Sequence, residues 1–173
     1  DEMQVAEHPV LASLREALRA RGLKLLTVEA GRPTPILVAG AQRRVRVKTD
    51  ANPAEGRPAG LYGNAFARAN EKAIRAATFP IDPPTVTNLV AIAAPAGGYG
   101  NYTAEEVRHI LETAFTGFSA ARLETGRLKG AGAPMAIHTG FWGCGAFGGN
   151  RELMALLQIV VAAMAETKLL VFH

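Results

Sequence analysis

Two periods of apolar residues run along the chain, and each is typical of one kind of element. In 8–21 the apolar side chains recur every three or four positions, which places them on one face of a helix that Gly22 ends. In 43–48 valines alternate with basic residues, which is typical of a strand with one buried face. The segment 50–64 contains five glycines and prolines and shows neither period, so it predicts a loop.

Applied to the whole chain, the two periods predict strands and helices that alternate in its second half. The expected helices cover 8–21, 64–78, 103 to about 122, and 150–168, and the expected strands cover 23–28, 35–38, 43–48, 85–92, 134–138 and 169–172. Thr103 and Glu106 have the spacing of a capping box, in which each satisfies a backbone N–H of the other. Strands that alternate with helices favour an α/β fold with largely parallel pairing.

Composition limits the class of protein. The 173 residues suit one domain over 1–173, and 49% hydrophobic with 20% charged residues is a globular balance. The longest apolar stretch, 153–165, is interrupted by Gln158 and is too short to cross a bilayer, so we expect no membrane partner. The chain begins with Asp1 rather than Met, which leaves open that it is a piece of a longer protein.

Charge and cysteine usage narrow the partners. A net charge of +4 favours anionic ligands in general, but it does not by itself indicate nucleic acid, which is the less favoured partner. One cysteine excludes a disulfide or a Cys-based zinc site within the chain, and the four histidines lack metal-ligand spacing. We therefore expect no metal, no cofactor and a reducing, cytoplasmic compartment, while the oligomeric state is not indicated.

A glycine-rich segment, 139–149, lies between the expected strand 134–138 and the helix that begins near Asn150. Its five glycines are Gly140, Gly143, Gly145, Gly148 and Gly149. Glycine lets backbone N–H groups approach a ligand closely, and a helix N-terminus attracts anions. A strand, a glycine-rich turn and a helix together form an arrangement that holds phosphates. The segment lacks the Lys of a P-loop and the spacing of a Rossmann dinucleotide motif, so both of those classes are disfavoured.

Three aromatic residues, Phe141, Trp142 and Phe147, are interleaved with these glycines. An aromatic face can stack on an adenine or cover a ribose. The alternative is that an aromatic side chain packs the loop onto the core, and this applies most to Trp142. Tyr99 and Tyr102, beside a second glycine-rich turn, either rim the ligand cleft or pack their own loop.

The run TGFWGCGAFGG resembles the corresponding loop of the poly(ADP-ribose) glycohydrolase family, a branch of the macrodomain fold. The resemblance extends in order and spacing from NLVAI at 88–92, through AFTGF at 114–118, to LLVFH at 169–173, about half of the chain. It implies a macrodomain-like three-layer α/β/α sandwich with a mixed, partly parallel sheet. It also implies ADP-ribose or ADP-ribosylated macromolecules as partners.

The resemblance implies roles for individual positions. The loop would wrap the diphosphate, Phe147 would pack against the sugar and adenosine side of the ligand, and Phe172 would contribute to the adenine pocket. Asn52, at the end of a DAN segment, would hydrogen-bond the ribose next to the scissile bond. The expected ligand-binding residues are Asn52, Thr139, Gly140, Phe141, Trp142, Gly143, Cys144, Gly145, Ala146, Phe147, Gly148 and Phe172.

The chain departs from the family at the catalytic positions. The family carries three consecutive glycines and then two adjacent glutamates followed by Ile-Arg, whereas Lys72 and Ala73 precede Ile-Arg here. Cleaving a glycosidic bond needs a carboxylic acid that protonates the leaving oxygen and then activates water, which neither residue can do. Glu71 lies one position before the aligned pair, and a shift of one residue turns a helical side chain by about 100°.

Three functions stay open. The first is a module that binds ADP-ribose or terminal poly(ADP-ribose) units through the loop, as a catalytically impaired relative of the family. The second is an active ADP-ribosyl glycohydrolase that uses Glu71, or Glu55 in the longer preceding loop, as a displaced general acid/base. The third is a macrodomain-like scaffold for another nucleotide or a protein partner. The departure at Lys72 and Ala73 favours the first.

Other candidate groups have simpler interpretations. His138 and Cys144 suggest a nucleophile pair, but Cys144 stands between two glycines and suits a small residue in a tight loop. Glu105 and Glu106 form a carboxylate pair that helix capping and first-turn electrostatics already explain. The basic residues of 43–48 are typical of a solvated strand face, and they could also attract a polyanion.

Overall fold

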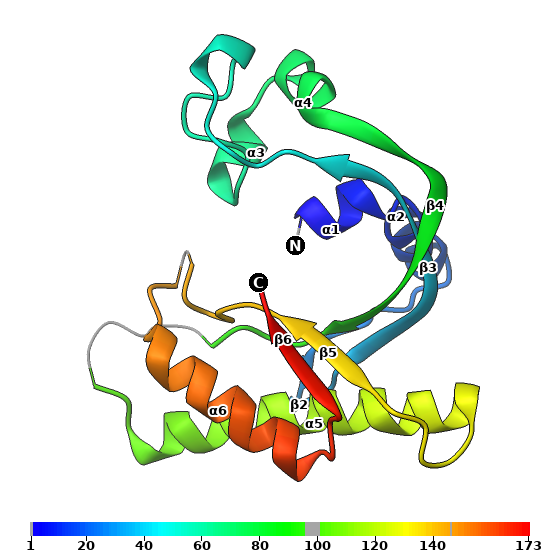
Figure 1. Cartoon of the computed structure of the whole chain (residues 1–173), viewed down its shortest axis with the longest axis vertical. Coiled ribbons are helices and arrows are strands. Elements are labelled where there is room, and N and C mark those ends of the chain that lie inside the picture. Colours follow the sequence, from blue (N-terminus) through cyan, green and yellow to red (C-terminus); the bar gives the residue numbers. More distant parts are fainter. Residues whose placement is uncertain (1, 96–100, 146) are drawn as a thin grey trace. The chain divides into compact units, whose positions relative to one another are not determined.

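The computed structural model describes residues 2–95, 101–145 and 147–173, in which helices and strands follow one another as Figure 1 shows. The elements are α1 (Glu2–Glu7), α2 (Val10–Ala20), β1 (Val28–Glu29), β2 (Arg32–Pro33), β3 (Ile36–Val47), the 3₁₀ helix η1 (Pro53–Glu55), α3 (Asn64–Arg68), α4 (Glu71–Ala77), β4 (Thr78–Ala91), α5 (Ala104–Lys129), β5 (Ala136–Thr139), α6 (Arg151–Met164) and β6 (Leu169–Phe172). They form two compact units. Unit 1 is Asp1–Lys24 with Val38–Leu89, and unit 2 is Leu25–Leu37 with Val90–His173.

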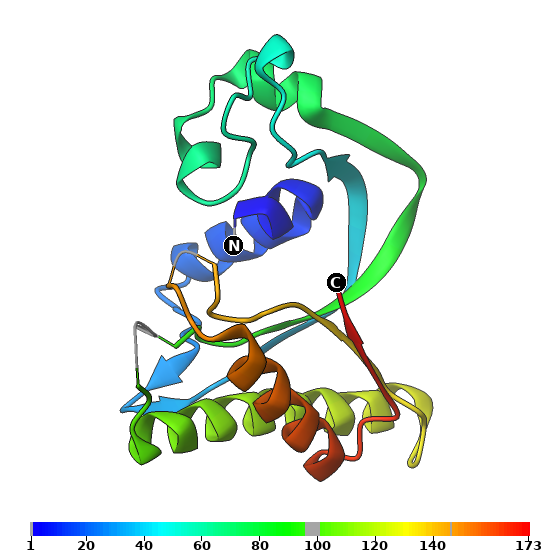
Figure 2. The same ribbon diagram turned by 60° about the vertical axis from the view of Figure 1, so that its left-hand side comes forward.

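The core of unit 2 lies between α5 and α6, which run side by side in Figures 1 and 2. Its buried members are Ala114 and Phe118 from α5 with Val161, Ala162 and Ala165 from α6 or its end, and Ile137 of β5 and Leu170 of β6 pack against them. Small side chains let the helices approach closely. At Gly117 a Cβ atom would lie 2.7 Å from Cγ2 of Ile92, so glycine is needed where α5 passes the chain that leaves β4.

The strands β5 and β6 pair in parallel, with α6 as the connection between them. Their register places Ala136 opposite Leu169 and Thr139 opposite Phe172. The parallel pairing predicted for this half is confirmed for this pair. Its consequence for the site is that the glycine-rich segment starts beside the last residues of β6.

The remaining described strands form two further sheets of two strands each, β1 with β2 and β3 with β4. Helices together with small sheets confirm the α/β class, while the three-layer sandwich with one mixed sheet stays a prediction. None of the helices in the described ranges combines the length and the apolar character that crossing a bilayer requires.

Strand β3 joins two predicted strands, 35–38 and 43–48, into one. Within it Val45 and Val47 are partly or fully buried while Arg44 and Arg46 are exposed, as the alternation predicted. Strand β4 likewise extends the predicted 85–92 backward to Thr78. The sequence pattern treats proline as a residue that ends a strand, and it therefore predicted a start that is too late. Strand β4 instead includes prolines.

The predicted strand 23–28 is wrong, because only its last residue joins a sheet. Val28 and Glu29 pair with the next two strand residues across a turn in which Ala30 and Gly31 both have positive φ, 49° and 74°. Positive φ at both central residues is the requirement of a tight hairpin turn. The apolar residues before it have no strand partner and are exposed, at 54% for Leu23 and 51% for Leu25.

Four predicted helices exist with different bounds. The predicted 8–21 is found as α2, and 64–78 divides into α3 and α4 because the Asn70 side chain accepts the N–H of Ala73 and starts a new helix. Helix α5 runs seven residues past its predicted end at 122, to Lys129. Helix α6 begins next to Asn150, as expected, with the Asn150 side chain as its N-cap, but it ends at Met164 rather than at 168.

Helix α1, which no pattern predicted, is held in unit 1 by a buried carboxylate. Glu7 is 8% exposed, and its Oε1 accepts the N–H of Val47 at 2.9 Å. Its Oε2 lies 2.7 Å from Nε of Arg43. A buried carboxylate needs such partners, and here they tie α1 to β3 beside the cluster of Val47, Leu61 and Ala77.

Replacing Glu7 by alanine is expected to lower the free energy of unfolding by about 1–3 kcal/mol, because the Val47 N–H loses a buried acceptor and the Arg43 guanidinium loses its ion-pair partner. Urea unfolding followed by circular dichroism measures the change. Glu16→Ala on the exposed face of α2 is the matched control, with an expected effect within about 0.5 kcal/mol. Equal effects of the two substitutions would contradict a structural role of Glu7.

Candidate functional site

The glycine-rich loop, residues 139–149, is fastened to the body of unit 2 at both ends. At its start the Thr139 hydroxyl donates to Oε1 of Gln158 at 2.7 Å, and the backbone N–H of His173 donates to the Thr139 carbonyl at 3.0 Å. At its end the backbone N–H of Asn150 donates to the hydroxyl of Tyr102 at 2.9 Å. The described residues at the two ends of the loop are therefore held by the body of unit 2.

Hydrogen bonds inside the loop fold it on itself. The N–H of Trp142 donates to the Gly140 carbonyl, Cys144 to Phe141, Gly148 to Gly145 and Gly149 to Gly143, at 2.9 to 3.1 Å. Glycine is required at Gly143, where φ is +76° and a Cβ atom would lie 2.8 Å from Cγ of Pro95. It is required at Gly149 as well, where a Cβ atom would lie 2.8 Å from the Gly143 carbonyl oxygen. These glycines serve close packing within the loop.

Other N–H groups of the loop have no partner within the part of the chain that the structure describes. These are the N–H groups of Gly140, Phe141, Gly143, Gly145 and Phe147. The first turn of α6 adds unpaired N–H groups, as every helix start does, while Asn150 satisfies that of Leu153 at 2.9 Å. Such an arrangement can bind an anion through backbone donors and the helix dipole. Ala146 lies outside the described residues.

The aromatic residues of the loop take different positions. Phe141 is 42% exposed, its ring centroid lies 5.9 Å from that of Phe172, and the Arg151 guanidinium lies 5.4 Å from it. Phe147 is 46% exposed. Trp142 instead packs against both hydrophobic clusters of unit 2, and its buried Nε1 has no hydrogen-bond partner among the described residues. Phe141 and Phe147 therefore expose apolar surface, and Trp142 anchors the loop.

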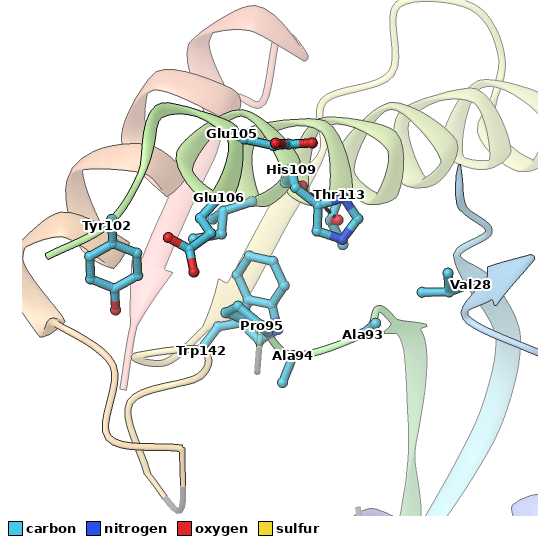
Figure 3. A pocket seen from close by; sticks show the side chains of 11 residues that line it. Val28, Ala93, Ala94, Pro95, Tyr102, Glu105, Glu106, His109, Thr113 and Trp142 are labelled. Atoms are coloured by element: carbon cyan, nitrogen blue, oxygen red, sulfur yellow. Dashed lines mark hydrogen bonds between the residues drawn. The ribbon is translucent and has the colours of Figure 1, made fainter. Parts of the chain in front are cut away.

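A pocket of about 470 Å³ is lined in part by Trp142. Figure 3 shows Glu105, Glu106, His109 and Thr113 along α5, with Trp142 and Pro95 across from them. The capping box accounts for Glu106, whose carboxylate accepts the Thr103 N–H at 2.7 Å and its hydroxyl at 2.9 Å. The bond from the Thr103 N–H, and to a smaller extent the bond from its hydroxyl, holds the pKa of Glu106 below its ordinary value.

Tyr102 and Tyr99 were predicted either to rim the ligand cleft or to pack their own loop, and their outcomes differ. Tyr102 lines the pocket, and its hydroxyl supports the end of the glycine-rich loop through Asn150. Tyr99 and the glycines of its turn lie outside the described residues. Pro95 and His109 were not identified from the sequence, because an isolated proline and a helical histidine carry no pattern.

Cys144 and His138 do not form a nucleophile pair among the contacts of the described residues. The Cys144 Sγ lies 3.6 Å from the Trp142 carbonyl, to which it donates. Burial raises the pKa of this thiol, and the nearby charge of Arg151 opposes that effect only in part. His138 instead meets His173, with Nδ1 and Nε2 2.8 Å apart and the rings stacked. A neutral thiol without a base has little nucleophilic character.

In unit 1 the segment around Asn52 is organised by Arg57, which is 3% exposed. Its guanidinium donates to the carbonyls of Asp50 at 2.7 Å and Lys48 at 3.2 Å, and it pairs with the Glu55 carboxylate. Asn52 accepts the N–H of Glu55 through its side chain. The sequence did not identify Arg57, because one arginine in a loop rich in proline and glycine is not distinguishable from a solvated one.

The positions that align with the family's glutamate pair lie at the start of α4. Glu71 is 77% exposed in its side chain and pairs with Arg75 one turn later, at 2.6 Å. Ala73 is 2% exposed, and a Cβ atom placed on Gly56 would lie 3.6 Å from its own Cβ. The second glutamate position is thus occupied by a buried methyl group in contact with the loop that carries Glu55.

Metal chemistry has no support within the described ranges, which contain no cluster of three or more His, Cys, Asp or Glu side chains placed to hold an ion. The site residues of unit 2 are brought together by the β5–β6 register and by the loop. Asn52, Glu55 and Glu71 belong to unit 1, where Asn52 and Glu55 share one turn and Glu71 lies on a separate helix.

Comparison with protein families agrees with the resemblance drawn from the loop. Residues 60–173 match the family model of poly(ADP-ribose) glycohydrolase (PARG), macro domain fold. The match includes the glycine-rich loop, both helices of the unit 2 core and the start of α4, and it begins after Asn52 and Glu55. Because it covers well over half of the chain, the chain belongs to the poly(ADP-ribose) glycohydrolase family.

Proposed function

We propose that the chain binds ADP-ribose, as a terminal unit of poly(ADP-ribose) or of ADP-ribosylated macromolecules, through the loop 139–149. The observation that carries this proposal is the set of five loop N–H groups without a partner among the described residues, at Gly140, Phe141, Gly143, Gly145 and Phe147. Unpaired donors lose little if water can reach them, and they gain charge-assisted hydrogen bonds when a diphosphate replaces that water. The positive charge of Arg151 favours the same ligand.

The remaining parts of the ligand have candidate contacts. Phe147 and Phe172 are proposed to cover the sugar and the adenine, and Asn52 to hydrogen-bond the ribose. The exposed fractions of Phe141 and Phe147 support an apolar ligand surface here, because large aromatic side chains are more often buried. We propose for the chain a macrodomain-like three-layer α/β/α sandwich with a mixed, partly parallel sheet, because parallel strands are normally covered on both faces. A reducing, cytoplasmic compartment fits its single cysteine.

We further propose that the chain binds its ligand without cleaving it. Lys72 and Ala73 replace the glutamate pair, and Ala73 has no room around it for a carboxylate side chain. Glu71 is held by Arg75 on an exposed face of α4. Hydrolysis requires a carboxylic acid poised at the leaving oxygen, and no described residue of α4 supplies one.

A glycohydrolase that uses Glu55 is the second candidate. In its favour, Gly56 lies beside Ala73, so Glu55 immediately precedes a residue that adjoins the family's second glutamate position. Against it, the Glu55 carboxylate pairs with the buried guanidinium of Arg57 and so acts as an acceptor rather than as a proton donor. A scaffold for another nucleotide or a protein partner is the third candidate.

Binding is tested by calorimetric titration of the chain with ADP-ribose, where we expect saturable heat in the micromolar range. Gly143→Ala is expected to weaken affinity at least about tenfold, equivalent to about 1.4 kcal/mol, because its Cβ would collide with Pro95 and its φ is positive. Gly126→Ala is the matched control, since no atom lies within 4 Å of its added Cβ. No heat at millimolar ADP-ribose would refute the binding proposal.

Catalysis is tested by release of ADP-ribose from poly(ADP-ribose) at protein concentrations high enough to detect single turnovers. We expect no release above the rate in buffer, because no acid is positioned at the cut. Should release occur, Glu55→Gln and Glu71→Gln identify its source, with Glu112→Gln on α5 as an exposed carboxylate control. If the parent chain releases ADP-ribose and either Glu55→Gln or Glu71→Gln by itself abolishes the release, that glutamate is the displaced acid. The non-cleaving assignment is then overturned.

A further inference from the structure

Gln158 is a buried polar residue in an otherwise apolar helix. It lies in the stretch 153–165 of α6, which is uncharged, and it is 2% exposed. Moving an amide out of water without replacing its hydrogen bonds destabilises the folded protein. A glutamine at this core position therefore needs buried hydrogen-bond partners. An apolar side chain could not bond to them.

Those partners are the first two residues of the glycine-rich loop. The Oε1 atom of Gln158 accepts the Thr139 hydroxyl at 2.7 Å, and its Nε2 donates to the Gly140 carbonyl at 3.1 Å. One acceptor and one donor on the same amide meet one donor and one acceptor on the loop. A carboxylate offers only acceptors, and an aliphatic side chain offers neither.

The bond to Gly140 determines the direction of a neighbouring group. In a planar trans peptide the carbonyl of one residue and the N–H of the next point in opposite directions. The Gly140 carbonyl is directed to Gln158 and also accepts the Trp142 N–H at 2.9 Å. The N–H of Phe141 must then point away from both, and it is one of the five loop donors without a partner among the described residues.

We propose that Gln158 is a positioning residue for anion recognition, which orients the Gly140–Phe141 peptide so that the Phe141 N–H faces the diphosphate. This proposal rests on the proposed function, because it assigns that N–H to the ligand. Gln158 itself does not touch the ligand. Its neutral amide is essential, since a negative charge at this place would repel both the Gly140 carbonyl and a bound diphosphate.

The test uses the full chain and two substitutions. Gln158→Glu keeps the shape and the acceptor for Thr139 but removes the donor to Gly140 while it is ionised. We expect its affinity for ADP-ribose to fall at least about tenfold at pH 8, and the deficit to shrink toward pH 5, where a protonated carboxyl donates again. Gln158→Leu is expected to lose a similar factor at both pH values.

Two controls separate positioning from loss of stability or charge. Val47→Ala removes a core side chain of unit 1, and Gln42→Glu adds a negative charge on an exposed position of β3. Both are expected to bind ADP-ribose within about twofold of the parent chain. If both Gln158 variants also bind within about twofold, or if the deficit of Gln158→Glu is the same at pH 5 and pH 8, the positioning role is overturned.

Amide hydrogen exchange without ligand distinguishes this proposal from the proposed function. If the parent chain does not bind ADP-ribose, the proposed function fails, and exchange at Trp142 decides the positioning role alone. We expect Gln158→Leu to accelerate exchange of the Trp142 N–H, which shares the Gly140 carbonyl, at least about tenfold more than Val47→Ala does. Equal acceleration by the two variants would overturn the orientation of Gly140 by Gln158.

Discussion

The two hydrogen bonds that the Gly140 carbonyl accepts determine the conformation at the start of the loop. This carbonyl receives the amide of Gln158 from α6 and the N–H of Trp142 from the next turn. Both donors lie on residues that are themselves held by the core, because Gln158 is buried and Trp142 packs on the clusters of α5 and α6. Core packing therefore orients this peptide. The orientation of the peptide in turn sets the direction of the N–H donors that follow.

The donors then divide into two sets with different tasks. One set closes turns inside the loop, and the other set, at Gly140, Phe141, Gly143, Gly145 and Phe147, is left without a partner among the described residues. Backbone donors recognise charge and shape without a cationic side chain, so the proposed diphosphate site does not require a net charge above +4. The aromatic residues between them supply apolar surface, as recognition of a nucleoside requires.

The sequence predicted the local features of this site and missed the tertiary ones. Capping by Thr103 with Glu106, a helix start near Asn150 and the parallel pairing of the last strand follow from spacing and order, and the structure has all three. Gln158 appeared only as an interruption of an apolar run, because its role depends on residues eighteen and nineteen positions away. The same holds for Arg57, whose carbonyl partners are set by the fold of its loop.

The first half of the chain shows why family membership does not settle activity. The buried methyl group of Ala73 fills one position of the family's acid pair, and a hydrated ion pair occupies the surface at Glu71. A loop locked by the Arg57 guanidinium occupies the neighbouring space. Retained recognition together with a lost acid is therefore the account that agrees with the described residues.

The central claim is that backbone N–H groups of the loop bind the diphosphate of ADP-ribose. Amide chemical shifts, followed by ¹⁵N–¹H NMR during titration with ADP-ribose, test it most directly, because an N–H that acquires a phosphate acceptor shifts strongly. The account predicts that the largest shifts occur at Gly140, Phe141, Gly143, Gly145 and Phe147, with smaller ones at amides already bonded within the loop. Saturable binding with these five amides unmoved would contradict it.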